Sequence, residues 1–583
     1  MLSLKCYQFL FLLFLCSFHS LSTKAQIWKW GVGSINSTAS ATEAWPIGLD
    51  SIGNIYESGS LGSSSGSDTN MAVFGADTVY AIGAAGQLIV VSSNSTGTYR
   101  WAICAGGAPS TIYNESSSFP LGMATDSSGN VYVFGCYLGS TITLGTRSAG
   151  NPLANTDGET MFFIAKISSS GQPLWIKNVA PANLLAMTGT LAMDYADNLY
   201  ITGTFTDSAI TIGTTTIYNH DPSGMSSDVF IAKLDSSGTA VWAKDIGGDT
   251  SELAQAIAVT RWGDIYCAGT FYSGSLAIGD TLVNSSSGAL PYFYIAKYDN
   301  SGNPVWARKA AACAAAGDTF NVCSHTVISG ITTDNWSNVY LACSAYDTLS
   351  FGSDTLFNSA SQLFAVLAGY SPAGNLKFAK AVTGTSIDTQ YTNAYSVAAD
   401  YCGKIWVSGG CTQISTLDGM FLSEFDTSGA HLFTTVQPGG GDDQNGLVLD
   451  NLGFVYVGGD YQYAPLYIGP EDTLNLYGGI SSESLFILAL SYPDGLCPIP
   501  ANDAVPQIAS PAIFNLFPNP AGTMITISSS EKINTLRLSN ILGQEVYTGS
   551  YNDTEVQVNI AGLSPGIYFL KINGVGVKKF IKE

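Results

Sequence analysis

The sequence predicts an all-β protein in which a seven-bladed β-propeller, closed by an N-terminal strand, is followed by a small C-terminal β-sandwich. Three observations lead to this prediction: a tight-turn motif returns seven times, strand-like segments flank every copy, and one repeat is divided between the two ends of the repeat region. The composition agrees, because 63 Gly and 11% aromatic residues among 583 are typical of short strands joined by tight turns.

The first marker of each repeat is an Asp turn followed by an aromatic residue, as in TDSSGNVYVFG at residues 125–135. The copies return at intervals of 50 to 76 residues, and each carries one aromatic residue at the same place. The seven aromatic residues are Tyr56, Tyr132, Tyr200, Tyr266, Tyr340, Trp406 and Tyr456. Apolar alternation around the turn predicts an antiparallel hairpin, which supplies the first two strands of each unit.

The polar residues of this first marker also suggest a calcium loop, through Asp126, Ser128 and Asn130. The copies do not keep these positions, since Arg261 and Lys404 intrude, and no Glu closes a twelve-residue loop. We therefore interpret the motif as a turn, in which its Gly permits a positive φ angle.

A second marker supplies strands three and four, and its clearest copies are residues 161–179, 229–246 and 293–310. These copies share an F-I-A-K-like strand, a Ser-Gly turn and a strand with a Trp. An additional short hairpin is expected between strands two and three of every unit except the sixth. The seventh unit has no fourth strand after residues 485–495, and QIWKWGVG at residues 26–33 matches the missing one. This first strand is predicted to close the ring and to remove a free edge.

Residues 26–495 resemble the SBBP family of bacterial β-propeller repeats. The resemblance rests on the D-x-x-G-N-x-Y and S-G-x-x-x-W elements, from which the chain departs at Arg261, Lys404 and Phe454. It implies a propeller fold in a secreted protein.

Residues 1–25 predict a secretory signal peptide, because one Lys precedes an apolar run of roughly ten residues and a polar stretch. Cleavage is expected between Ala25 and Gln26. The apolar run is shorter than the about 20 residues of a membrane anchor, and no later segment is long and apolar enough to span a bilayer. We therefore expect an exported chain without a transmembrane helix.

Residues 496–513 form a Pro- and Ala-rich linker, and the alternating strands of residues 514–583 predict a small Ig-like β-sandwich. This tail resembles the type A C-terminal sorting domain of the type IX secretion system of Bacteroidetes. The resemblance rests on Pro518, Asn519, Pro520, Gly543, Pro565, Gly566, Tyr568, Lys578 and Lys579. It implies that the chain passes through the periplasm, binds the type IX secretion machinery and is secreted or reaches the outer cell surface. An ordinary adhesive module is the alternative.

A net charge of −22 and a pI near 4.3 argue against nucleic acid as a partner, since phosphates need Lys and Arg. Cysteine use fits an exported chain in which Cys313 and Cys323 could close a loop as a disulfide. Cys402 and Cys411 flank an extended segment that holds them too far apart to pair. We interpret each of these as a structural or free thiol, and no C-x-x-C pattern predicts a zinc site.

No catalytic, cofactor-binding or metal site is predicted from the sequence. His220, His325 and His431 match no nucleophile or metal motif and are interpreted as incidental. The adjacent carboxylates Asp442 and Asp443 are interpreted as part of a solvated loop.

Propeller topology predicts that the two kinds of short turn share one face of the ring. The long segments 136–160, 204–228 and 310–327 are expected on the opposite face, where binding loops usually lie. Our first hypothesis is a non-catalytic binding module for a glycan or protein ligand on that long-loop face. The alternatives are a secreted carbohydrate-active enzyme, either a hydrolase or a lyase, and a structural or adhesive surface component.

Overall fold

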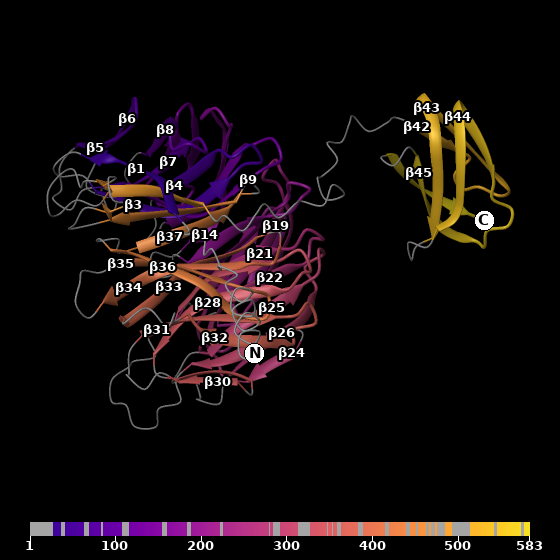
Figure 1. Cartoon of the computed structure of the whole chain (residues 1–583). Coiled ribbons are helices and arrows are strands. Elements are labelled where there is room, and N and C mark those ends of the chain that lie inside the picture. The colour runs from indigo at the N-terminus through magenta and orange to yellow at the C-terminus, as the bar shows by residue number, and fades with distance from the viewer. Residues whose placement is uncertain are drawn as a thin grey trace, which may run out of the picture. The chain divides into compact units, whose positions relative to one another are not determined.

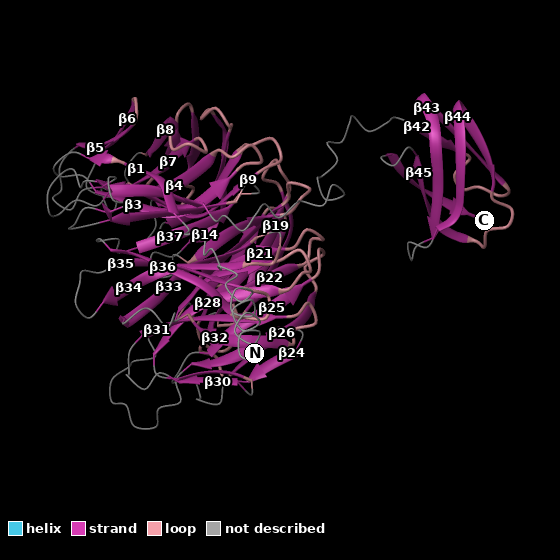
Figure 2. Cartoon of the chain, in the orientation of Figure 1, coloured by secondary structure: helices cyan, strands magenta, loops and turns pink. Residues whose placement is uncertain are grey.

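The structure, a computed structural model, is all-β in the part of the chain that it describes, as expected (Figures 1 and 2). The chain divides into two compact units, Met1–Cys497 and Pro498–Glu583, which we call the repeat domain and the tail domain. The described residues are 27–36, 41–62, 69–82, 86–107, 116–153, 160–182, 188–221, 225–278, 280–283, 292–312, 327–346, 348–352, 354–357, 363–382, 389–400, 402–413, 419–438, 443–450, 453–461, 466–467, 473–474, 484–491, 514–540, 545–572 and 576–583.

Each of the seven sequence repeats forms four described strands that pair in order in one antiparallel sheet. The first strands are β3 (Ala41–Leu49), β9 (Ser117–Thr125), β15 (Gly189–Met193), β21 (Glu252–Val259), β27 (Val327–Thr333), β33 (Thr389–Ala399) and β37 (Asp443–Leu449). The second strands are β4 (Ile55–Gly62), β10 (Val131–Leu138), β16 (Leu199–Phe205), β22 (Ile265–Phe271), β28 (Val339–Tyr346), β34 (Ile405–Gln413) and β38 (Phe454–Tyr461).

The outer half of each sheet follows the same order. The third strands are β7 (Gln87–Ser93), β13 (Thr160–Ile167), β19 (Asp228–Leu234), β25 (Tyr292–Tyr298), β31 (Leu363–Tyr370), β35 (Gly419–Phe425) and β41 (Ser484–Ser491). The fourth strands are β8 (Tyr99–Gly106), β14 (Pro173–Ala182), β20 (Ala240–Ile246), β26 (Pro304–Ala312), β32 (Leu376–Ala381), β36 (His431–Pro438) and, for the seventh unit, β1 (Ile27–Gly33).

Strand β1 joins the two ends of the repeat region. It pairs antiparallel with β41 from Ile27 opposite Ser491 to Gly33 opposite Phe486. The pairing continues beyond the strand, where the amide of Ser34 donates to the carbonyl of Leu485 at 2.9 Å. The first strands also contact one another in a ring, each touching those of the two neighbouring units and β37 touching β3.

Six short hairpins stand between second and third strands, and none is described in the sixth unit, as the sequence predicts. They are β5 (Thr69–Phe74) with β6 (Asp77–Ile82), β11 (Thr141–Leu144) with β12 (Arg147–Gly150), β17 (Ala209–Ile212) with β18 (Thr215–Tyr218), β23 (Ser275–Ile278) with β24 (Asp280–Val283), β29 (Thr348–Phe351) with β30 (Asp354–Phe357), and β39 (Leu466–Tyr467) with β40 (Thr473–Leu474). Strand β2 (Ile35–Asn36) pairs with β5.

These hairpins cover the outer edges of neighbouring sheets. Strand β11 pairs with β8, the fourth strand of the preceding unit, and β29 pairs in the same way with β26. A paired outer strand no longer offers free backbone groups to another chain. Part of the long segment 136–160 is therefore the extra hairpin that the sequence predicts, and it covers the end of β8.

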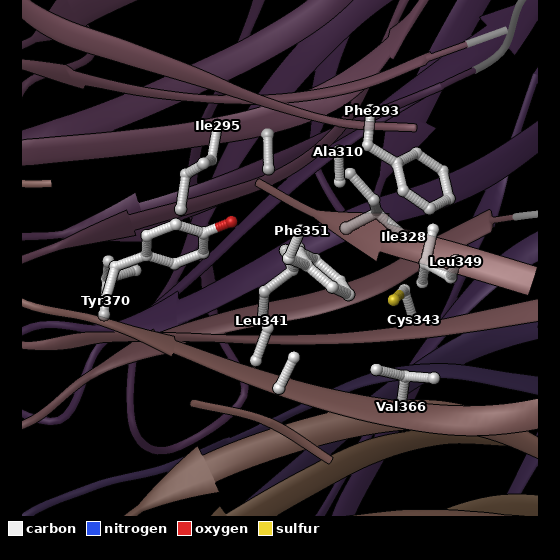
Figure 3. Close-up of a cluster of buried hydrophobic side chains, with 14 of the residues drawn as sticks. Phe293, Ile295, Ala310, Ile328, Leu341, Cys343, Leu349, Phe351, Val366 and Tyr370 are labelled. Atoms are coloured by element: carbon white, nitrogen blue, oxygen red, sulfur yellow. The ribbon is translucent and has the colours of Figure 1, made fainter. Parts of the chain in front are cut away.

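The core lies between adjacent sheets, so the middle strands are buried on both faces. Strands β10 and β22 have every residue buried, which explains why their sequences run apolar without a polar face. Figure 3 shows one such layer, where Phe293 and Ile295 of the fourth unit lie near Ile328 and Leu341 of the fifth. A unit therefore completes its core only against its neighbours.

Among the described residues, an aromatic ring on the fourth strand packs against a glycine in the turn between the third and fourth strands of the next unit at six of the seven junctions. A Cβ atom built on Gly171 would lie 2.8 Å from the Trp101 ring, and Gly171 has a φ of +83°. The Trp101 indole N–H also donates to the carbonyl of Ser169 at 3.0 Å. The same ring-on-glycine pairs are Trp30 with Gly97, Trp175 with Gly238, Trp242 with Gly302, Trp306 with Gly374 and Phe378 with Gly429. We call these contacts the unit staples.

The Asp of the first marker folds its own turn. The Asp126 Oδ1 atom accepts the amides of Ser128 and Asn130 at 3.0 and 2.8 Å, while Oδ2 accepts the Asn130 amide group at 2.9 Å. Gly129 has the expected positive φ, +75°. Lys166 of the second marker reaches the same carboxylate at 2.9 Å. The polar residues that suggested a calcium loop thus hold the turn and tie the two markers together.

The tail domain forms one five-stranded antiparallel sheet around its own core. Its strands are β42 (Phe514–Phe517), β43 (Met524–Asn540), β44 (Glu545–Asn559), β45 (Gly566–Ile572) and β46 (Gly576–Lys582). Strand β43 pairs with β42 and β44 through its first half and with β44 and β45 through its second. The register shifts between Ser528 and Ile533, and side chains such as Ile527, Leu538 and Leu570 are fully buried.

Replacing Gly171 by Ala is expected to lower the free energy of unfolding of the repeat domain by about 2–4 kcal/mol. The alanine must take up a positive φ and meet the Trp101 ring. Urea denaturation followed by tryptophan fluorescence measures this, because all ten Trp residues precede residue 407. Gly150→Ala is the matched control, since a Cβ there meets nothing within 4 Å. Equal losses in both variants would contradict the staple interpretation.

Candidate functional site

A cavity of about 540 Å³ lies at the centre of the repeat domain, and residues from all seven first strands line it. Every unit contributes its innermost strand, so the cavity follows directly from the ring of contacts among these strands. Its polar side chains are Thr190, Gln255, Ser329, Tyr395 and Ser396. Pro, Gly and aliphatic residues make up the remainder of the described lining.

The polar groups of the cavity lining are hydroxyls and one side-chain amide. Hydroxyl and amide groups can donate and accept hydrogen bonds to a neutral polar ligand. The described lining contains no Asp, Glu, His, Lys, Arg or Cys, and the phenol of Tyr395 is its one ionisable side chain. Tyr395 is the one aromatic residue of this lining.

Titratable groups gather elsewhere, between the third and fourth units at the start of β19 and β21. The Nδ1 atom and the backbone amide of His220 both lie 2.8 Å from Asp228 Oδ2, and the Asp228 side chain is fully buried. Burial raises the pKa of Asp228, and the His220 contacts oppose this rise. The sequence interpretation treated His220 as incidental, whereas in the structure it contacts the buried carboxylate of Asp228.

Glu252 is the second buried carboxyl of this group. Its Oε1 accepts the Ser273 hydroxyl, and its Oε2 accepts the Gly248 amide at 2.9 Å. Burial, reinforced by the charge of Asp228, raises the pKa of Glu252 to about 8. Glu252 is therefore mostly protonated at neutral pH, and no sequence motif pointed to it.

The other residues that the sequence offered for a chemical role are either exposed or outside the described residues. His431 Nε2 lies 2.6 Å from Thr434 Oγ1 on β36. His325 and Asp442 lie outside the described residues, as does the side chain of Asp443. Within the described part of the chain, no three His, Cys, Asp or Glu side chains are grouped as metal ligands.

Cys402 corrects one sequence interpretation, because it is disulfide-bonded rather than a thiol. Cys411 is a buried free thiol, so the two do not pair, as expected. The partner of Cys402, like Cys313 and Cys323, lies outside the described residues.

Three large aromatic side chains stand exposed on the Asp turns of three consecutive units, of which the fourth unit's turn has Thr260 in place of the Asp. Tyr195 is 64% exposed, Trp262 is 68% exposed and Trp336 is 58% exposed. Each turn joins a first strand to a second strand, the two strands nearest the central cavity. Sequence reasoning treated these turns only as repeat markers. The signal that could have found the site is an aromatic residue inside three successive copies.

The tail domain brings several of its sequence-predicted residues together. The Asn519 side chain donates to the carbonyl of Lys579 at 3.2 Å and accepts the amide of Ile581 at 2.9 Å. The Tyr568 hydroxyl donates to the carbonyl of Ser564 at 2.9 Å, and its ring stacks on Phe580 with centroids 5.7 Å apart.

The remaining predicted tail and leader residues fall into two groups. Pro518, Pro520, Pro565, Gly566, Lys578 and Lys579 are exposed on the tail domain. Ala25, Gln26 and Gly543 lie outside the described residues. The Asn519 contacts show that the Pro-Asn-Pro segment lies along the last strand, β46, and pairs with its backbone.

Comparison with known families identifies the tail. Residues 515–583 match the family model of the secretion system C-terminal sorting domain. A domain of this kind marks a protein for export to the cell surface or for secretion, and it implies contact with the secretion machinery. Across the described residues, no helix has the length and apolar character needed to cross a membrane.

Relatives of the repeat domain are distant. An uncharacterised WD repeat-containing protein of Acanthamoeba polyphaga mimivirus is 23% identical over 232 residues, which span 36% of this chain and 16% of the viral protein. The chain thus matches about a sixth of the length of that relative.

Solved structures with a similar arrangement of strands are also remote. A protein of unknown function from Dyadobacter fermentans is 8% identical, with 79% of this chain and 98% of that one covered and a TM-score of 0.37. An ulvan lyase is 10% identical, with 77% and 97% covered and a TM-score of 0.38. PorZ, a surface component of the type IX secretion system of Porphyromonas gingivalis, is 11% identical, with 96% and 100% covered and a TM-score of 0.17. At these scores the likenesses do not bear on function.

Replacing Glu252 by Gln is expected to change how stability depends on pH. The folded-state pKa of about 8 lies above the unfolded value of about 4.3, so the wild type loses the stability linked to this proton as pH rises between the two values. The Glu252→Gln variant has no carboxyl proton at this position and does not lose this stability. In urea denaturation its free energy of unfolding should match that of the wild type near pH 5 and exceed it at pH 9. A variant that is less stable at pH 9 would contradict the raised pKa.

Proposed function

We propose that the mature chain is an exported protein with three parts: a seven-bladed β-propeller at residues 26–495, a linker at 496–513 and a sandwich-like sorting domain at 514–583. The leader would be removed between Ala25 and Gln26. Seven four-stranded sheets, the contacts among their first strands and the pairing of β1 with β41 support the propeller. The match of residues 515–583 supports type IX export in a bacterium of the Bacteroidetes.

We further propose that the propeller binds a glycan without catalysing a reaction on it. The single observation that carries this proposal is the central cavity, which the described strands line with hydroxyl and amide groups and without any Asp, Glu, His, Lys, Arg or Cys side chain. Such a lining can hold a polar, uncharged ligand by hydrogen bonds, and it lacks the pair of carboxyl groups that most glycoside hydrolases use.

A carbohydrate-active enzyme is the second candidate, and one observation favours it. Glu252 has a pKa raised to about 8 and lies within the electrostatic influence of Asp228, which is the kind of carboxyl that serves as a general acid. Its side chain is fully buried, however, whereas a general acid must reach its substrate. We therefore place binding first.

Deleting residues 514–583 should leave the protein in the periplasm, because the leader still acts but the sorting domain is absent. The measurement is immunoblotting of periplasmic, surface and medium fractions from cells that express the full-length or truncated chain. Deleting the linker residues 500–507 instead leaves the sorting domain intact and serves as the control. Normal surface or medium levels of the truncated protein would contradict the proposed export route.

The binding proposal predicts that the purified mature chain retains glycans on an array and releases no sugar from the same polysaccharides. Reducing-end and unsaturated-product assays on the retained polysaccharides separate binding from hydrolysis and from lyase action. Product formation that is lost in Glu252→Gln would favour the enzyme candidate. An array without any retained glycan would contradict the binding proposal.

A further inference from the structure

The exposed aromatic residues of the third, fourth and fifth units are not needed by the turns that carry them. The turns are already held by their own polar residues, as where Asp194 Oδ1 accepts the amides of Ala196 and Asn198 at 2.9 Å each. In the first and second units Ser51 and Ser127 stand at the position of Tyr195, and Ile52 and Ser128 stand one residue later, at the position of the two Trp residues. An aromatic ring at either position therefore adds nothing that the turn requires.

The two Trp rings are held in place while one side stays open. A Cβ on Gly403 of the sixth unit would lie 2.8 Å from the Trp336 ring, so this ring rests against the neighbouring turn and is still 58% exposed. The Arg261 guanidinium lies 4.7 Å from the centroid of the Trp262 ring. Rings with one supported face and one open face cost little conformational entropy when a ligand stacks on them.

Polar side chains flank the three rings within their turns. Arg261 and Asn335 each precede a Trp, and Asp197 lies two residues after Tyr195 and accepts the amide and hydroxyl of Ser127 in the second unit at 2.9 and 2.8 Å. A protein partner usually needs a continuous apolar centre with a polar rim. The mixture of aromatic and polar side chains on these turns does not provide such a centre. Sugars match it, because a pyranose has an apolar C–H face for a ring and hydroxyl groups for the polar neighbours.

The charges of this surface argue for an uncharged ligand. On the three turns and the ends of the third strands beside them, four carboxylates stand against three cations, namely Asp194, Asp197, Asp264 and Asp334 against Lys233, Arg261 and Lys297. Lys297 is paired with Asp264 at 2.7 Å, so a strongly anionic polymer would meet an excess of negative charge.

We propose that the Asp turns of the third, fourth and fifth units form a binding surface for a neutral polysaccharide. Tyr195, Trp262 and Trp336 stack on sugar rings along one chain, one ring from each unit. This rests on the proposed glycan binding and extends it from the central cavity to the turns that join the two innermost strands of these units. A surface with one aromatic platform per unit suits a polymer, whose repeat offers successive sugars to successive units.

The experiment compares Tyr195→Ala, Trp262→Ala and Trp336→Ala with the wild type in the mature chain. The probes are soluble xyloglucan, glucomannan and laminarin as neutral polysaccharides and polygalacturonate as an anionic one, measured by affinity electrophoresis and titration calorimetry. Each loss of a ring should weaken binding to a neutral probe roughly three- to ten-fold. Tyr218→Ala is the matched control, since this Tyr is 67% exposed on a separate hairpin and should leave affinity unchanged.

The outcomes separate this surface from glycan binding as such. If the wild type binds a neutral probe and the three variants bind it equally well, the surface proposal is wrong while glycan binding stands. Binding of polygalacturonate alone would overturn the neutral class, and binding of no probe would overturn both proposals. Thermal unfolding of each variant within about 2 °C of the wild type excludes misfolding. A variant that fails this check is replaced by its Phe form, which should retain binding.

Discussion

The contact between an aromatic ring and the glycine of the next unit's turn is the constraint on which the repeat domain depends. The ring occupies the space that any side chain would need, as at Gly171, Gly238 and Gly374. The glycine therefore serves two purposes, since the turn also needs its positive φ. Six of the seven junctions between units carry this contact among the described residues, and at each of them it fixes the rotation of one unit against the next.

Buried carboxylates also recur from unit to unit, and the sixth unit shows how their charge is compensated. In the fourth unit Asp264 of the turn pairs with Lys297 of the third strand at 2.7 Å, whereas the sixth unit has Lys404 and Glu424 at these two positions, with their charged atoms 2.8 Å apart. The positive and negative residues have exchanged positions, and the ion pair is preserved. A lone charge at either position would be buried without compensation, which costs several kcal/mol. Lys404, at which the chain departs from the family pattern, is thus compensated by Glu424.

The arrangement of strands could be predicted from the sequence because each unit repeats two periodic signals, a Gly turn and an alternating strand. The completion of the last sheet by β1 could also be predicted, since residues 26–33 match a fourth strand that residues 485–495 lack. The outer position of β11 and β29 could not, because a strand that pairs with a strand of another unit leaves no local pattern in the sequence. The sequence did not reveal Glu252 for the same reason, because its raised pKa depends on burial between two units. It did not reveal the exposure of Trp262 either, because that exposure depends on how the units are arranged.

Ring closure by β1 has a consequence for the order of folding. Leu485 donates its amide to Ser34 across a separation of 451 residues, and closing a loop of that length costs about 5 kcal/mol in chain entropy before any contact repays it. The partner of β1 is β41, which is synthesised after the other described strands of the repeat domain. Strand β1 therefore leaves the ribosome long before it can pair. The tail domain follows β41 in the chain. A molecule that presents a complete sorting domain consequently has every strand it needs to close, so a single C-terminal tag can report on the completeness of the cargo.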